Sequence, residues 1–271
     1  MDKGNIPVLT ATGATLPEAW EKSVLETWRH GVEVHTEYDR EGDPASRECT
    51  MIMVVEKPMS EPRIHRAFPA GLEELEVYRL EVVDGVHDHW IDPAAGKWTY
   101  TYHKRLFDFE MEGKHIDQMA YVVDKLSAAA ITRRAQAITW NPALDPPTDD
   151  PPCLQRLWFR LLETGDGEYA LNMNTHWRSR DAYKAAFMNI FAMTDLQRIV
   201  AERIAEKTGK KVVPGRYADI SDSYHIYGSY FAEFEGFLKL IENRTFEQRT
   251  WHSEYAESFF AEGRARIENE K

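Results

Sequence analysis

The sequence predicts a mixed α/β fold, in which helices flank a sheet. Segments with helical apolar periodicity alternate along the chain with short runs of the alternating or continuous apolar kind that strands require. No strand is followed by a Gly-rich turn and a helix, so neither a dinucleotide-binding motif nor a P-loop is expected. The sequence shows no internal repeat and no low-complexity linker, and we expect residues 1–271 to form one domain.

The first predicted helix begins at Thr15-Leu16-Pro17-Glu18. Thr15 can cap the free backbone N–H groups of the first turn, Pro17 is favoured in that turn, and Glu18 can reach back to the capping residue. We expect it to run to about Gly31 and to bury Trp20, Val24 and Trp28. A second helix is predicted over 72–83, stopped by Gly85, and a third over 116–126, where Ile116, Met119, Ala120 and Val123 share one apolar stripe. The longest helix is predicted over 181–207, ended by Gly209. Two more are predicted over 230–242 and from about Ser253, where the chain is highly charged.

The predicted strands are short and apolar. They span 51–55, 135–140, 154–162, 169–175 and 216–221. Gly165-Asp166-Gly167 separates the third from the fourth and is typical of a hairpin. A loop rich in Pro and Asp, over 141–152, precedes this hairpin.

Composition excludes several classes of protein. Hydrophobic residues make up 43% of the chain, enough for a sizeable core, and the net charge of −12 disfavours broad nucleic-acid binding. The first ten residues lack the features of a signal peptide, and no apolar run is long enough to span a bilayer. The two cysteines form no CxxC or Cys/His group, so no metal site is expected. These features favour a cytoplasmic protein without a membrane partner.

Cys153 directly follows Pro151-Pro152, and proline restricts how the chain approaches the next strand. By itself this residue is best interpreted as a buried structural cysteine, as is Cys49. Arg178-Ser179-Arg180-Asp181 precedes the longest predicted helix, where two arginines and a hydroxyl can form a phosphate site. Asp181 can equally serve as a helix cap. An arginine near Cys153 would lower the pKa of the thiol.

Other polar residues carry weaker signals. Arg133-Arg134 alone is typical of a solvated surface, and His225 and Tyr227, expected after a strand and a turn, are typical structural hydrogen bonders. Asn189 is a poor helix former inside a predicted helix, which indicates a hydrogen-bonding task. Glu74, Tyr78 and Glu81 share one helical face, which solvation would also explain.

Taken in order, these groups resemble the thymidylate synthase family, from about residue 98 to residue 234. The resemblance is closest to the shorter, archaeal-like branch and to related pyrimidine nucleotide hydroxymethylases. The matching residues are Tyr102, Ile116-Asp117-Gln118, Thr132-Arg133-Arg134-Ala135, Trp140-Asn141, Pro151-Pro152-Cys153, Arg178-Ser179, Asp181, Asn189 and His225-Ile226-Tyr227.

The resemblance implies a fold with a mixed sheet flanked by helices and a homodimer that packs through the sheet. It implies one-carbon transfer from 5,10-methylenetetrahydrofolate to C5 of a pyrimidine nucleoside monophosphate. Cys153 matches the nucleophile that adds to C6, and Arg178 the arginine that holds the phosphate beside the thiolate. Asn189 matches the residue that reads the base, favouring a uracil edge, and Asp181 a contact of the folate pterin.

Further roles follow from the same resemblance. Ser179 and Arg47 are expected to contact the nucleotide, His225 and Tyr227 its sugar, and Tyr102 is expected in the active site. Arg133 and Arg134 match the pair that the neighbouring subunit donates to the phosphate. A glutamate organises the water that removes the C5 proton, and Glu74 and Glu81 are the candidates.

The product is left open by two departures from the long bacterial enzymes. Leu154 stands where those enzymes carry His, and the charged segment 266–271 replaces a short apolar tail that closes over the folate. Hydride transfer from tetrahydrofolate would give a methyl group, as in the conversion of dUMP to dTMP, whereas water would give a hydroxymethyl group. A non-catalytic nucleotide-binding relative is the alternative of another class.

Overall fold

A mixed sheet forms the centre of the computed structural model, which describes residues 4–270. Residues 1–3 and Lys271, which belong to the N-terminal segment and the charged tail considered above, lie outside the described residues. The strand order is β1 (Val8–Gly13), β3 (Ser46–Val55), β10 (Lys211–Ile226), β9 (Glu168–Asp181), β8 (Leu154–Gly165) and β7 (Gln136–Ile138), with β2 (Val32–Val34) also paired to β3. β1 pairs with β3, and β10 with β9, in parallel, whereas the other pairs are antiparallel. The predicted mixed sheet is therefore confirmed.

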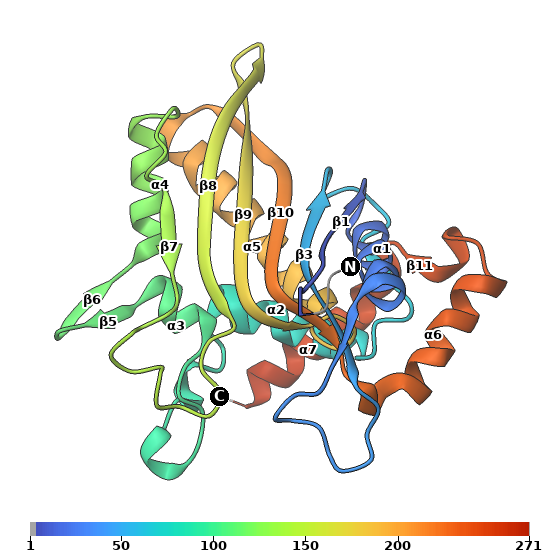
Figure 1. Cartoon of the computed structure of the whole chain (residues 1–271). Coiled ribbons are helices and arrows are strands. Elements are labelled where there is room, and N and C mark those ends of the chain that lie inside the picture. The colour runs from blue at the N-terminus through green and yellow to red at the C-terminus, as the bar shows by residue number, and fades with distance from the viewer. Residues whose placement is uncertain (1–3, 271) are drawn as a thin grey trace.

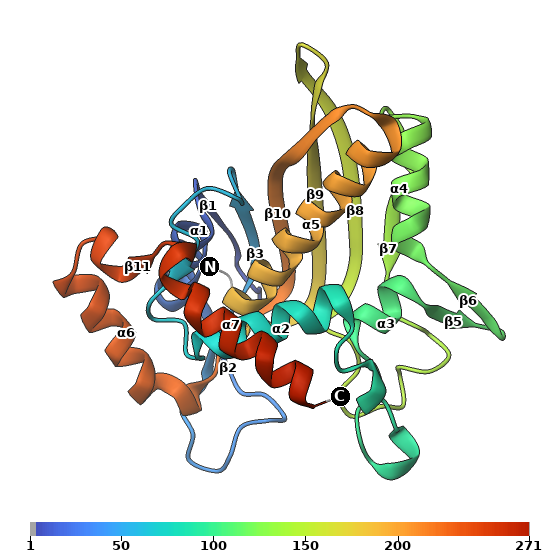
Figure 2. The ribbon, with the colours of Figure 1, turned by 180° about the vertical axis from the view of Figure 1, so that it is seen from behind.

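Helices cover one face of this sheet (Figures 1 and 2). α5 (Ala186–Thr208), α2 (Leu72–Asp84) and α7 (Ser253–Asn269) lie behind it in Figure 1, whereas the front face of β8, β9 and β10 carries no helix. α1 (Leu16–His30) packs beside β1 and β3, and α4 (Gln118–Ala128) lies beside β7. The remaining elements are α3 (Tyr102–Phe107), α6 (Phe231–Asn243), a hairpin of β5 (Phe109–Met111) and β6 (Lys114–Ile116), and the pair β4 (Ile64–His65) and β11 (Thr250–Trp251).

The two faces of the sheet follow from side-chain alternation. On β9, Leu171, Met173 and Trp177 are buried, whereas Asn172 and Asn174 between them are only half-buried. Successive side chains of a strand point to opposite faces, so the apolar set meets the helix layer and the polar set lies on the face without helices. The sequence pattern thus decides which face the helices cover.

The first helix behaves largely as its pattern predicts. Trp20 and Val24 are fully buried, and the Trp20 indole N–H donates to the carbonyl oxygen of Ala182 at 2.9 Å. Trp28 is half-buried and packs against Phe231 and Phe234, so its expected full burial is wrong.

The longest helix begins later than expected. It starts at Ala186, not at residue 181, because β9 continues to Asp181 through parallel pairing with β10. The interpretation of Arg178-Ser179-Arg180-Asp181 as a helix start is therefore wrong. The Asp181 carboxylate instead accepts from the N–H groups of Tyr183 and Lys184, in the turn before the helix.

Several strands extend beyond their expected bounds, one helix begins later, and one strand was not predicted. β10 runs from Lys211 to Ile226, so His225 lies inside a strand and does not follow one. The helix expected from residue 116 starts at Gln118, because Asp117 caps it, and Ile116 lies in a hairpin with 40% of its surface exposed. Ala120 is exposed as well, so only part of the predicted apolar stripe is buried. β1 was not predicted, and its exposed alternate residues explain why the apolar pattern is weak there.

Of residues 4–270, no stretch forms a helix of the length and apolar character that crossing a bilayer requires.

Core burial predicts a contrast between two leucines. Leu157 on β8 is fully buried, whereas Leu144 has 58% of its surface exposed. We expect Leu157→Ala to lower the free energy of unfolding by about 2–5 kcal/mol, because it removes buried methyl groups and leaves a cavity. Leu144→Ala, the matched control, should change it by less than about 0.5 kcal/mol. Urea unfolding followed by circular dichroism measures both, and similar values for the two variants would contradict this packing.

Candidate active site

Cys153 lies in the loop that leads into β8, one residue before the strand begins, and is half-buried. Arg178 on the neighbouring strand β9 holds this loop. Its backbone N–H donates to the carbonyl oxygen of Cys153 at 2.9 Å, and its guanidinium donates to the carbonyl oxygens of Pro152 (3.1 Å) and Pro151 (2.5 Å). The two prolines thus present carbonyls to Arg178, and this contact fixes where the thiol stands.

Opposing effects set the pKa of the Cys153 thiol. Burial is the largest and raises it, the positive charges of Arg178 and Arg180 lower it, and the carboxylate of Asp150 raises it, so that the result lies above the usual value. The expected lowering by a nearby arginine is present but is smaller than the effect of burial. The thiol is therefore protonated at neutral pH in the free protein. Cys49 is fully buried, as expected for a structural cysteine, and burial raises its pKa to about 11.

Tyr102 packs beside the cysteine loop. Its hydroxyl accepts from the backbone N–H of Leu154 at 3.3 Å, and its ring meets the edge of Trp177 at a centroid distance of 5.8 Å. Burial raises the pKa of Tyr102, and the nearby Tyr100 and Cys153 raise it further. Both tyrosines remain neutral hydrogen-bonding groups next to the thiol.

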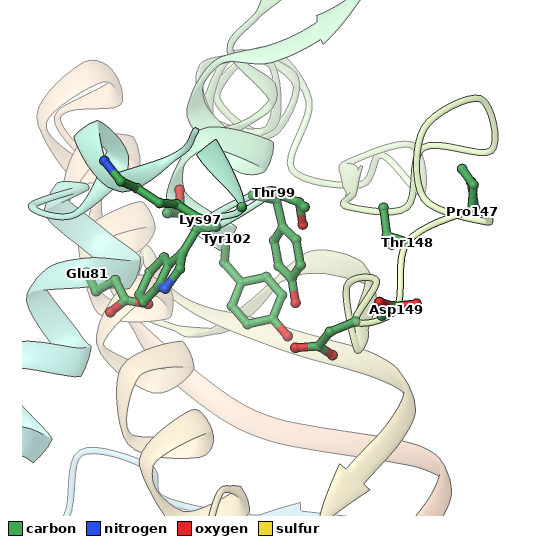
Figure 3. Close-up of a pocket in the computed structure, with 12 residues that line it drawn as sticks. Glu81, Lys97, Thr99, Tyr102, Pro147, Thr148 and Asp149 are labelled. Carbon is green, nitrogen blue, oxygen red and sulfur yellow. The ribbon is translucent and has the colours of Figure 1, made fainter. Parts of the chain in front are cut away.

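A cleft of about 660 Å³ opens beside these residues. It is lined by Glu81 from α2, by residues 96–102, and by residues 147–150 of the loop that precedes Cys153. Figure 3 shows Glu81 on one side, Asp149 on the other, and Tyr102 between them. Asp150, which lines the cleft, raises the pKa of the Cys153 thiol, and the thiol in turn raises the pKa of Tyr100, another lining residue. The thiol therefore lies close to the cleft, although it does not line it.

The structure separates the two candidate glutamates. Glu81 is hydrogen-bonded to His87, with 3.1 Å between Oε2 of Glu81 and Nδ1 of His87. Burial raises the pKa of Glu81, whereas His87 lowers it. Glu74 does not line the cleft. Its side chain is 51% exposed and pairs with Arg266 of α7 at 3.7 Å.

Asn189 joins the same group from α5. It is almost fully buried, and its Nδ2 donates to the hydroxyl of Tyr78 at 2.6 Å. Charge interactions with Tyr102 and Glu81 act on the pKa of Tyr78, which burial raises. Asn189 and Tyr78 therefore lie close to Tyr102 and Glu81, and of these four only Tyr102 and Glu81 line the cleft.

Ser179, His225 and Tyr227 line a second cavity of about 250 Å³, together with Tyr38. The rings of His225 and Tyr227 meet edge to face at 4.5 Å, and burial lowers the pKa of His225 to about 4, so the imidazole is neutral. Asp181 lies nearby, and burial raises its pKa to about 6 although two backbone N–H groups oppose this. The strand pairing of β9 with β10 brings Ser179 and Asp181 close to His225 and Tyr227.

Three arginines lie elsewhere. Arg133 and Arg134 line a cavity of about 520 Å³ at β7, where the indole N–H of Trp158 donates to the carbonyl oxygen of Arg133 at 3.2 Å. Arg47 pairs with Glu33 at 3.0 Å and stacks over the ring of Trp28. Within one chain, none of the three lines the cleft beside Cys153.

Sequence reasoning missed several residues of the site. Tyr100, Asp149 and Asp150 line the cleft, and Arg40 lines a cavity of about 540 Å³ that shares Tyr38 and Tyr227 with the second cavity. The aspartates carried a usable signal, because they stand within four residues of Cys153 in a loop tied to it. Arg40 lies in a polar loop without an apolar pattern, so only the fold shows where it stands.

Within residues 4–270, no group of three or more His, Cys, Asp and Glu side chains is arranged to hold a metal ion.

The chain is similar to known proteins of one family. The family model described as thymidylate synthase matches residues 72–254. A provisionally assigned thymidylate synthase of Methanococcoides burtonii is 28% identical over 228 residues, covering 84% of this chain and 94% of the relative. One of Methanopyrus kandleri is 31% identical over 201 residues, covering 72% and 84%. The fold matches thermostable thymidylate synthase A of Bacillus subtilis, with a TM-score of 0.59, 19% identity, and coverage of 82% and 83%.

The charges around Cys153 predict its reactivity. We expect Arg178→Gln to raise the pKa of the thiol and Asp150→Asn to lower it, because the first removes a positive charge and the second a negative one. The pH dependence of alkylation by iodoacetamide, read by peptide mass spectrometry, should move in opposite directions in the two variants. Arg156→Gln, an exposed change on β8, is the control. Identical profiles for all variants would contradict the geometry.

Proposed function

Because the chain belongs to the thymidylate synthase family, we propose that it transfers a one-carbon unit from 5,10-methylenetetrahydrofolate to C5 of a pyrimidine nucleoside monophosphate. Methylation of dUMP to dTMP is the reaction we favour, with residues 1–271 acting as one catalytic domain. The arrangement of Cys153 beside the cleft, with its loop held by Arg178, supports this proposal most directly.

Cys153 has the role of nucleophile in this proposal. C5 of uracil is too weak a nucleophile to react unaided, and addition of the thiolate to C6 converts the ring into an enolate that reacts at C5. The thiol is protonated in the free protein, so it must lose its proton once the nucleotide is bound. Arg178 and Arg180 favour the thiolate formed in that step.

Asn189 reads the base and stabilises the enolate. Its amide is nearly buried and already aligned by Tyr78, so it can donate to the developing oxyanion with little reorganisation. Tyr102 keeps the start of β8 in place through the N–H of Leu154. We assign no proton transfer to Tyr102, because burial keeps its hydroxyl neutral.

Glu81 organises the water that removes the C5 proton. It lines the cleft, and its partly buried carboxylate has a raised pKa, which suits a group that takes up and releases a proton. Glu74 faces α7 and solvent, so we do not assign it this role.

The remaining residues hold the ligands. Arg178 and Ser179 bind the phosphate, and His225 and Tyr227 contact the sugar, with Arg47 as a further contact of the nucleotide. Ser179, His225 and Tyr227 line one cavity, and this shared position together with the neutral state of His225 supports their assignment. Asp181 contacts the pterin, and its pKa of about 6 lets it accept or donate a hydrogen bond there.

The cleft fits the co-substrate in size and lining. Trp98 and Tyr100 offer aromatic surface, and Glu81, Asp149 and Asp150 offer acceptors for the amino and ring N–H groups of a pterin. The folate supplies the carbon and, for methylation, the hydride. The protein supplies position and the exclusion of water.

A homodimer would complete the phosphate site. The sheet face without helices offers a surface for a second copy, and Arg133 and Arg134 stand at its β7 edge, outside the cleft of their own chain. We propose that the partner donates these two arginines, as the resemblance to the family implies.

Hydroxymethylation is the second candidate, and a specific observation favours it. Thr99, Thr148, Asp149 and Asp150 give the cleft a polar wall that can hold water near the transferred carbon. Leu154, which follows the nucleophile, is fully buried and brings no polar group to the site. Water would then trap the methylene intermediate before hydride transfer.

A product assay tests the proposed function. With methylenetetrahydrofolate and each of dUMP, dCMP, UMP and CMP, we expect dUMP to gain a methyl group while dihydrofolate forms, as mass spectrometry and absorbance will show. A hydroxymethyl product without dihydrofolate supports the second candidate. Cys153→Ser should abolish turnover and covalent capture of 5-fluoro-dUMP, and Cys49→Ser is the control. Turnover that survives in Cys153→Ser would exclude Cys153 as the nucleophile.

The two glutamates give a matched pair of variants. We expect Glu81→Gln to lower kcat by about 10²–10⁴-fold, the usual contribution of a positioned acid or base. It should still form the covalent adduct with 5-fluoro-dUMP, because addition of the thiolate precedes removal of the C5 proton. Glu74→Gln should change kcat by less than about twofold, as expected for an exposed ion pair. A larger loss in Glu74→Gln than in Glu81→Gln would reverse the assignment.

A further inference from the structure

His87 lies between two carboxylates. Its Nδ1 is 3.1 Å from Oε2 of Glu81, and its Nε2 is 3.6 Å from Oε2 of Glu270. Only 4% of the residue is exposed, and Nε2 has no hydrogen-bond partner among residues 4–270. Figures 1 and 2 both show the C-terminal end of α7 near the segment that follows α2, where His87 stands.

This arrangement requires an additional proton. A neutral imidazole carries one N–H and one lone pair, so one ring nitrogen would turn its lone pair toward a carboxylate oxygen. That contact is repulsive and, because the ring is buried, solvent does not relieve it. The contact becomes favourable if the imidazole carries both hydrogens, or if one of the two carboxyl groups is protonated.

The surroundings of His87 favour the proton on the imidazole. Its ring stacks on Trp90 with 3.6 Å between centroids and 10° between planes, and Trp98 meets it edge to face at 6.0 Å. A cation over an indole face is stabilised by the negative face of the ring. Trp98 also lines the cleft, so this group adjoins the proposed folate site.

Ion pairs hold the end of α7 in place. Arg266 pairs with Glu73 of α2 at 2.6 Å and lies 3.9 Å from Glu270 itself. Asp88 acts on Glu81, and His89 lies beside His87 at 6.4 Å between ring centroids. Of the charged and titratable groups on these elements, Glu81, Glu270 and His89 contact His87 directly, and Arg266 and Asp88 act on it through the two carboxylates.

We propose that His87 carries a hydrogen on both ring nitrogens, so that the additional proton is shared between the carboxylates of Glu81 and Glu270. His87 is then the positioning residue that keeps Glu81 ionised and aimed into the cleft. This inference rests on the proposed role of Glu81 in organising the catalytic water. It assigns the end of α7 a task in the reaction, because the carboxylate of Glu270 lies opposite the second ring nitrogen at 3.6 Å.

A measurement on the resting protein tests the shared proton without any substrate. In the ¹⁵N-histidine-labelled protein at neutral pH, we expect both His87 ring nitrogens to show the chemical shifts of N–H nitrogens. His87→Gln identifies the signals by removing them. In Glu270→Gln one nitrogen should shift to the value of an unprotonated nitrogen, whereas Glu268→Gln, an exposed change two residues away, should leave both unchanged. One unprotonated nitrogen in the parent protein would overturn the proposal.

The pH dependence of turnover tests the positioning role. His87 lowers the pKa of Glu81, so His87→Gln should raise it, and the acidic limb of the kcat profile should move up by about one pH unit. An unchanged profile in a folded His87→Gln variant would overturn the role of His87. If the parent protein turns over none of the four nucleotides, the proposed function fails, while the nitrogen shifts still decide whether the proton is shared.

Discussion

The parallel pairing of β9 with β10 is the interaction on which the rest of the site depends. It runs from the pair Glu168 and Lys211 to the pair Asp181 and His225, and brings together residues that are 43 positions apart before its register shift and 44 after it. Arg180 and Asp219 form a fully buried ion pair between the two strands, and Arg180 also stacks over Trp177 at 4.2 Å. Removing one partner of such a pair leaves a buried charge without compensation. This pairing sets Arg178 against the cysteine loop on one side of β9 and Ser179 against His225 on the other.

The same pairing explains where sequence reasoning succeeded and failed. Helices with strong apolar periodicity, such as α1 and α6, could be predicted closely, because burial of one face imposes the pattern. Arg178 to Asp181 could not be placed, because a polar run before a helical pattern is equally consistent with a cap and with the end of a strand. Long-range pairing with β10 decides between them, and that pairing has no local signature. The site residues came from their order along the chain, whereas Tyr100 and Arg40 required the fold.

Burial and neighbouring charges have opposite effects on the pKa values of Cys153 and Asp195, and a different effect is the larger in each case. At Cys153, burial exceeds the effect of two arginines. At Asp195, which pairs with Arg79 and Arg198 behind the site, the arginines exceed burial and the pKa of the carboxyl is lowered. The difference follows from geometry, because the arginines contact Asp195 directly, whereas Arg178 spends its hydrogen bonds on Pro151 and Pro152. In the free protein the Arg178 guanidinium therefore holds the loop, and its lowering of the thiol pKa is smaller than the effect of burial.

The protonated state of Cys153 has a consequence for the life of the enzyme between turnovers. Peroxides and other oxidants attack thiolates much faster than thiols, and the first oxidised form, the sulfenic acid, can no longer add to a pyrimidine. A half-buried thiol with a raised pKa is a poor target for such damage while the cleft is empty. The burial that raises the pKa of the thiol thus also protects Cys153 from oxidation.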